Sequence, residues 1–160
     1  MVQEIINVVK RGTRGKEPLN IEKIHDMVEY AVEDITGVSA SQVEMQSGLQ
    51  FYDGMSTDEI QQILIKSAAD LISLENPNYQ YVAARLLLYS LRKQVIDKLW
   101  DHPHIFEHTK KCIEKGVYDP SILESYEKKD FDRMENWINH NRDYDFTYAG
   151  LRQVIDKYLV

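Results

Sequence analysis

Apolar side chains recur at three- and four-residue spacing along most of the first hundred residues, and this period predicts amphipathic helices. The first run follows Asn20, a preferred N-cap residue, and ends near Gly37, so we expect a helix over residues 21–36. A shorter helix that runs to about Leu49 is predicted next, because Ser39 is followed three residues later by Gln42, and Ser41 by Glu44. That spacing is typical of a capping box.

Two further helices are predicted from the same period. Ser56 and Glu59 have the spacing of a capping box, and the apolar stripe behind them indicates a helix over about 57–72. Asn76 followed by Pro77 is a favoured cap and first-turn pair, which opens a helix that reaches about residue 95 or 99. These are the most regular apolar runs in the chain.

The chain before the first helix has a different pattern. Residues 5–9 are β-branched and apolar apart from one asparagine, and a basic stretch with Gly12 and Gly15 separates them from residues 17–19. This arrangement predicts a small hairpin, and Asp53-Gly54 predicts a turn further along. The expected fold is therefore mainly α, with four helices and a hairpin in one compact unit.

The helical period breaks around residues 100–103, where His102-Pro103 indicates a connector. A second helical group is expected beyond it, with helices over about 104–115, 120–125, 127–139 and 146–158. Its apolar positions are few for an independent core. The apolar end at residues 158–160 suggests that the natural polypeptide continues or that a partner covers the end.

Composition narrows the class of protein. The chain has 160 residues, is 43% hydrophobic and carries a net charge of −7, which is globular and acidic. It has neither an apolar run long enough to cross a membrane nor the features of a signal peptide, so we expect a cytoplasmic protein without a membrane partner. Its acidity argues against a nucleic-acid partner, and its single cysteine excludes internal disulfides and zinc sites built from two CxxC pairs.

One local cluster opposes the overall charge. Lys10, Arg11, Arg14 and Lys16 lie within seven positions, immediately before the predicted helix start at Asn20. Basic side chains beside the unpaired N–H groups of a helix N-terminus are suited to a phosphate-bearing ligand. Taken alone, such a cluster is more often a solvated loop.

A metal site is the other chemistry that the residue types suggest. His104, His108 and Cys112 share a helical face, and His102 lies nearby. The acidic, exposed setting and the lack of a clear complete ligand set speak against it, so no metal ligands are predicted.

The ordered motifs of the chain closely resemble the ATP-cone, a nucleotide-sensing domain formed by a four-helix bundle under a small β-hairpin or three-stranded sheet. The resemblance covers residues 4–95. It rests on Val9-Lys10-Arg11, Glu17 with Asn20, Lys23-Ile24, Asp53-Gly54, Thr57-x-x-Ile60, Tyr79-Gln80-Tyr81-x-Ala83-Ala84-Arg85 and Arg92-Lys93.

Later segments resemble the N-terminal region of the class Ia ribonucleoside-diphosphate reductase large (alpha) subunit, of the enterobacterial and tailed-phage type. These segments are Gln50 to Gly54, Ala68 to Ser73, Gly116-x-Tyr118-Asp119, Arg142-Asp143-x-x-Phe146-x-Tyr148 and Lys157 to Leu159. The resemblance implies that residues 96–160 begin the helical N-terminal domain of that subunit.

The resemblance also implies an ATP or dATP site. Lys10, Arg11 and Lys93 would hold the phosphates, with Mg²⁺ bridging phosphate oxygens, and Thr57 would approach the base or sugar. Near relatives often carry histidine where this chain has Gln61, which keeps a donor and an acceptor without a positive charge. The residues expected to line the nucleotide are Glu17, Leu19, Asn20, Ile21, Glu22 and Lys23.

The function implied by the resemblance is allosteric control of ribonucleotide reduction, in which ATP activates and dATP inhibits. The implied partners are the remainder of the large subunit, a radical-generating small (beta) subunit and further copies in a homo-oligomer. Catalysis in this family needs three thiols, and Cys112 supplies only one, so we expect no catalytic residue in this chain.

Two other functions stay open from the sequence. One is a stand-alone nucleotide-sensing cone, as in transcription regulators that pair the cone with a four-cysteine zinc ribbon. The other is a helical protein-interaction domain whose basic hairpin docks an acidic partner.

Overall fold

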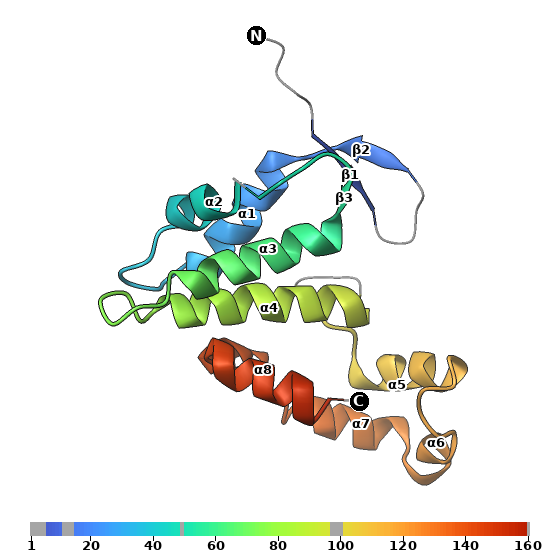
Figure 1. The fold of residues 1–160 in the computed structure, drawn as a ribbon. Helices are drawn as coiled ribbons and strands as arrows, with labels where there is room; N and C mark the ends of the chain where they lie inside the picture. Colours follow the sequence, from blue (N-terminus) through green and yellow to red (C-terminus); the bar gives the residue numbers. More distant parts are fainter. Residues whose placement is uncertain (1–5, 11–14, 49, 97–100, 160) are drawn as a thin grey trace. The chain divides into compact units, whose positions relative to one another are not determined.

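A computed structural model describes residues 6–10, 15–48, 50–96 and 101–159 of the chain (Figure 1). These residues form mainly α-helices with one small sheet, which confirms the predicted fold class. Contacts divide the chain into two units, residues 1–91 with 144–160 and residues 92–143. None of the described helices is long and apolar enough to cross a membrane.

The sheet of the first unit has three short strands, β1 (Asn7–Val9), β2 (Lys16–Pro18) and β3 (Met55–Ser56). Their order is β2-β1-β3, with β1 antiparallel to β2 and parallel to β3. The predicted hairpin is therefore confirmed. The register pairs Val8 with both Glu17 and Met55. Val8 and Met55 are buried, so one face of the sheet covers the helices of this unit.

The turn before β3 is fastened to β1. The Asp53 carboxylate accepts hydrogen bonds from the Asn7 backbone N–H at 2.8 Å and from its side-chain amide at 2.9 Å. The hydrogen bond from the backbone N–H, and after it the bond from the side-chain amide, hold the pKa of Asp53 below its ordinary value. The N–H of Gly54, whose φ of +85° suits glycine, donates to the Asn7 carbonyl at 2.8 Å. The predicted turn thus joins the third strand to the hairpin.

The helices of the first unit are α1 (Ile21–Val32), α2 (Ala40–Gly48), α3 (Thr57–Asp70), α4 (Tyr79–Ile96, whose last residues belong to the second unit) and α8 (Tyr148–Lys157). Their core contains fully buried side chains from several helices. Val28, Leu64 and Val82 belong to the predicted apolar stripes, whereas Val43, Tyr79 and Tyr89 do not.

Two helix boundaries differ from those predicted. α1 ends at Val32 because Asp34 adopts a left-handed conformation with φ of +58°. The Arg85 guanidinium on α4 donates to the Glu33 carbonyl at 2.6 Å, so another helix satisfies this end of α1. α4 begins at Tyr79, two residues after Pro77, and the turn before it is fastened by an Asn78 side chain that donates to the Thr36 carbonyl.

An exposed histidine links α1 to α2. His25 Nδ1 lies 2.7 Å from Glu44 Oε1, and this hydrogen bond, followed by the attraction of the same carboxylate, raises the pKa of His25. Because the pKa of His25 is higher in the folded state, the pair stabilises the fold fully at pH values below the pKa of the unfolded chain, about 6.5. This contribution is lost as the pH rises through the pKa of the folded state.

We therefore expect His25 to titrate above its ordinary range in an NMR pH titration, and Glu44→Gln to return it toward that range. The free energy of unfolding should fall more between neutral and mildly alkaline pH in the wild type than in Glu44→Gln. Equal His25 titration curves in the two proteins would contradict this coupling.

The second unit contains α5 (Ile105–Glu114), α6 (Ser121–Ser125), α7 (Lys128–Glu135) and the 3₁₀ helix η1 (His140–Asp145), whose last two residues belong to the first unit. Phe131 of α7 is buried and packs edge-on against Phe106 of α5, with ring centroids 5.3 Å apart. α7 ends four residues before the predicted boundary, and η1 follows where no element was predicted. α8, predicted with this group, is assigned by its contacts to the first unit.

Buried charge and stacked rings fasten η1 within this unit. The Arg92 guanidinium donates to Asp143 at 2.8 Å, and Arg92 is only 6% exposed. His102 stacks on His140 with ring centroids 3.9 Å apart. The pKa of His102 is lowered first by burial and then by the charges of His140 and Arg92. These contacts join the start of the unit to its end.

Candidate functional site

The two lysines that the structure describes in the basic cluster lie on opposite faces of the hairpin. Successive residues of a strand point to opposite faces, so Lys10 falls on the same side as the buried Val8. Its Nζ lies 2.8 Å from Glu17, the β2 residue that faces Val8. Lys16 lies on the other side, 3.9 Å from Asp53. Lys10 and Glu17 therefore share the face that covers the helices, and Lys16 does not.

Lys10 also leaves the sheet beside the start of α3. The parallel register pairs Val9 with Ser56, so the next residues along each strand, Lys10 and Thr57, are neighbours. Thr57 is the first residue of α3, so α3 leaves the sheet at the end where Lys10 lies. α1 follows β2, whose last residue Pro18 pairs with Asn7, and so it leaves the sheet at the opposite end (Figure 1). Helix N-termini favour anions, so Lys10 beside the start of α3 adds to an electropositive site.

The start of α1 is capped as predicted. The Asn20 side chain accepts a hydrogen bond from the Lys23 N–H at 3.0 Å. Helix geometry leaves the N–H groups of Ile21 and Glu22 without an intrahelical partner. The first turn of α1 can therefore donate backbone hydrogen bonds to a ligand.

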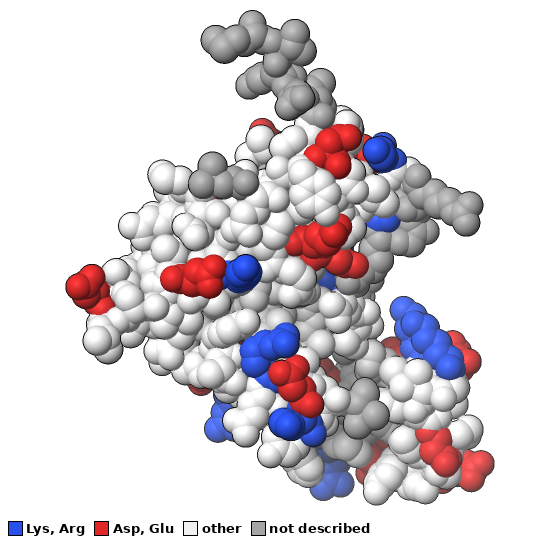
Figure 2. Space-filling view, viewed as in Figure 1, with Lys and Arg blue, Asp and Glu red and all other residues white. Residues whose placement is uncertain are grey.

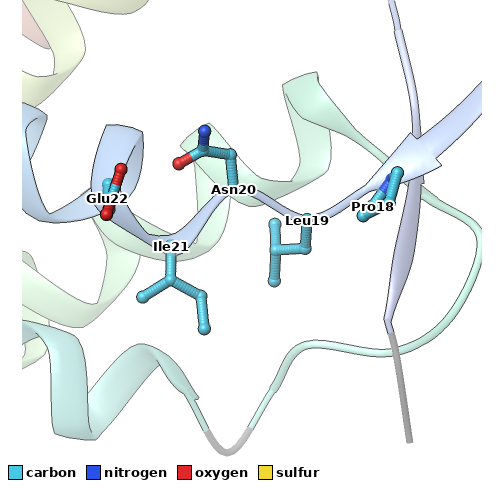
Figure 3. A pocket seen from close by; sticks show the side chains of 5 residues that line it. All are labelled: Pro18, Leu19, Asn20, Ile21 and Glu22. Atoms are coloured by element: carbon cyan, nitrogen blue, oxygen red, sulfur yellow. The ribbon is translucent and has the colours of Figure 1, made fainter.

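A shallow, open hollow of about 360 Å³ lies along the segment that joins β2 to α1. In Figure 3 the side chains of Leu19 and Ile21 point to one side of this segment and that of Asn20 to the other. Ile21 is 72% exposed, which is unusual for the first isoleucine of an amphipathic helix. The residues that line the hollow are Pro18, Leu19, Asn20, Ile21 and Glu22.

The start of α3 is held by the predicted capping box. The Ser56 side chain accepts from the Glu59 N–H at 3.1 Å, and the Glu59 carboxylate accepts from the Ser56 N–H at 2.7 Å. The pKa of Glu59 is lowered first by the hydrogen bond from the Ser56 backbone N–H, and then by hydrogen bonds with the Ser56 and Tyr52 side chains. This cap fixes Thr57 and, one turn later, Gln61. The Oε1 atom of Gln61 is buried and has no hydrogen-bond partner among the described residues.

The ATP-cone domain family matches residues 6–94 of this chain, which is more than half of its length. The chain belongs to the ATP-cone family. Membership implies that the cone binds a nucleotide effector. The region matched contains the sheet, the hollow and the start of α3 described above.

Curated relatives extend the similarity to nearly the whole chain. It is 44% identical over 153 residues to ribonucleoside-diphosphate reductase 1 subunit alpha of Escherichia coli, and 44% identical over 154 residues to the alpha subunit of Haemophilus influenzae. The alpha subunit of Enterobacteria phage T4 is 39% identical over 159 residues. Each alignment covers 96–98% of this chain and 20% of the relative, so the chain spans about a fifth of the length of these proteins.

The described residues of the predicted nucleotide site fall into three groups, and their role in binding stays a prediction. Lys10 contacts Glu17, residues 19–22 line the hollow, and Thr57 and Gln61 follow one another on α3. Arg11 lies outside the described residues. Lys93 lies on the last turn of α4, within the second contact unit, and its part in the site stays a prediction.

The charges on the cone fit a small anion better than a polymer. On the face drawn in Figure 2, Lys and Arg are interspersed with Asp and Glu, whereas duplex binding needs an extended basic surface. Among the described residues, no group of three or more His, Cys, Asp or Glu side chains is arranged to hold a metal ion.

Sequence reasoning missed the fastening of Asp53 to Asn7, which holds β3 and the start of α3 beside Lys10. The two residues are 46 positions apart, and each separately has only the pattern of a strand or turn residue. The Asp53-Gly54 motif was the one available signal, and it identified the turn but not its partner.

Proposed function

We propose that this chain is the allosteric, nucleotide-sensing region of a ribonucleoside-diphosphate reductase alpha subunit, and that it binds ATP as activator and dATP as inhibitor. The observation that carries the proposal is the ATP-cone match together with 44% identity to such subunits over 96% of the chain. The geometry at the sheet supports it, because Lys10 follows β1 at the end of the sheet where α3 begins.

In the proposed site, the triphosphate lies against Lys10 and the first turn of α3, with Arg11 and Lys93 adding charge. Ammonium and guanidinium groups form the stronger, charge-assisted hydrogen bonds to phosphate oxygens. Mg²⁺ would bridge those oxygens, because protein-bound Mg²⁺ is usually held by substrate phosphates and only one or two protein carboxylates. Glu22 and Lys23, in the first turn of α1, complete the polar rim.

The nucleoside part would occupy the hollow before α1. An exposed isoleucine beside Leu19 offers an apolar surface to a flat ring, and burying it removes apolar area from water. Asn20 and Thr57 offer neutral hydrogen bonds. Gln61 is suited to accept from a ligand N–H or O–H, because leaving a buried acceptor unpaired costs about 1–3 kcal/mol.

The rest of the proposed function lies outside this chain. Ribose reduction by a thiyl radical and a cysteine pair would take place in the remainder of the alpha subunit, with the radical supplied by a small (beta) subunit. We propose that the nucleotide acts by favouring one homo-oligomeric assembly over another in the cytoplasm. Control of this kind requires that ATP and dATP prefer different assemblies, since equal affinity for both shifts nothing.

Isothermal titration calorimetry of the 160-residue chain with ATP, dATP and, as control, adenosine tests the nucleotide site. We expect saturable binding of both triphosphates in the presence of Mg²⁺ and much weaker binding of adenosine, which lacks the phosphates. Absence of saturable binding by either triphosphate would contradict the proposal and favour a protein-interaction domain.

A further inference from the structure

The lysine expected to bind phosphate already has an anionic partner. Lys10 Nζ lies 2.8 Å from Glu17 Oε1, and the two side chains come from neighbouring strands on the face of the sheet that covers the helices. A carboxylate at this distance accepts from one of the three N–H donors of the ammonium group and offsets its charge, so it competes with a phosphate oxygen for Lys10. The ligand must therefore displace Glu17 before it can use the full charge of Lys10.

The exposure of the pair makes such a displacement possible. The Lys10 and Glu17 side chains are 49% and 43% exposed, so water screens their attraction. A triphosphate carries several negative charges and can also accept hydrogen bonds from the start of α3 beside Lys10, which Glu17 on its strand does not complement. The multiply charged ligand thus has the advantage over the single carboxylate.

We propose that Glu17 is an internal competitor for the phosphate site, which it keeps neutralised until a ligand with enough phosphate charge takes Lys10 from it. This inference rests on the proposed nucleotide-binding function and concerns the regulation of the same site. Its consequence is selectivity by phosphate content. Through this competition Glu17 lowers the affinity of every ligand that engages Lys10, and the competition has no effect on a ligand that leaves the pair intact.

Two variants and their combination isolate this competition. Glu17→Gln keeps the length of the side chain and its hydrogen-bonding capacity but removes the charge, and Lys10→Ala removes the group being competed for. The double variant completes a cycle that separates the pairwise effect from any other contact of Glu17 with the nucleotide.

The control is Glu75→Gln. Glu75 is exposed in the loop between α3 and α4, at the far end of α3 from the sheet. A helix of 14 residues is about 21 Å long, so this variant makes the same change in net charge away from the site.

The probes are sodium tripolyphosphate, ATP and adenosine, titrated into the 160-residue wild type and each variant by calorimetry at low salt. We expect Glu17→Gln to bind tripolyphosphate and ATP about two- to fivefold more tightly than the wild type, the range for a half-exposed ion pair. Adenosine affinity should not increase, and Glu75→Gln should match the wild type.

The cycle decides the mechanism. In the Lys10→Ala background, Glu17→Gln should raise ATP affinity by a clearly smaller factor than in the wild type. An equal factor in both backgrounds would overturn the inference, because Glu17 would then only repel phosphate at long range. No gain, or a loss, for tripolyphosphate in Glu17→Gln would overturn it too. These outcomes differ from failure of the proposed function, in which the wild type binds neither ATP nor tripolyphosphate.

Discussion

Lys10→Ala is expected to weaken ATP binding by about tenfold to a hundredfold while leaving the fold intact. Hydrogen bonds to charged groups contribute about 1.5–3 kcal/mol, which corresponds to that range of dissociation constants. Lys10 is exposed at the end of β1, so its removal leaves no buried cavity. The same loss is expected for Lys93→Ala if Lys93 supplies the second charge to the phosphates.

Calorimetry with ATP measures this effect, and circular dichroism checks that each variant is folded. Lys66→Ala is the matched control, because Lys66 is an exposed lysine of α3 that lies nine residues after Thr57. It should bind ATP as the wild type does. Unchanged ATP affinity in both Lys10→Ala and Lys93→Ala would count against the proposed site.

The second large effect concerns the stability of the helix that carries Thr57 and Gln61. Leu64 is 0% exposed at the centre of α3, and we expect Leu64→Ala to lower the free energy of unfolding by about 3 kcal/mol. The loss combines the missing apolar burial with the cavity that the shortened side chain leaves. It is a large fraction of the roughly 5–15 kcal/mol that stabilises a typical domain.

Urea denaturation followed by circular dichroism measures this loss as a lower midpoint with an unchanged slope. Gln62→Ala is the control on the same helix, since Gln62 is exposed and alanine is a good helix former, and its effect should stay within about 0.5 kcal/mol. A Leu64→Ala midpoint equal to that of the wild type would mean that α3 does not depend on this side chain.

The local features of the cone could be predicted from sequence because their cause lies within a few residues. Asn20 as N-cap and the Ser56–Glu59 capping box each join groups three positions apart, and both are confirmed. The hairpin is similar, since a short loop brings β1 and β2 together. Backbone geometry over one turn sets such contacts, whatever the rest of the chain does.

Features that depend on distant residues could not be predicted. α1 ends early beside an Arg85 that is 52 positions from Glu33, and η1 is held by an Arg92–Asp143 pair across 51 positions. The apolar period continued past Val32 and gave no sign that another helix would satisfy the end of α1. The roles of the predicted site residues, Lys93 among them, stay a prediction.

The sequence by itself determined the family, the helices and the type of residue expected to bind phosphate, because these depend on short motifs and their order along the chain. Only the tertiary structure decided which residues meet. It separated Lys10 from Lys16 on two faces of the hairpin, paired Lys10 with Glu17, and brought the turn at Asp53 to Asn7. Strand register and packing between distant segments determine these contacts, and neither is set by local spacing.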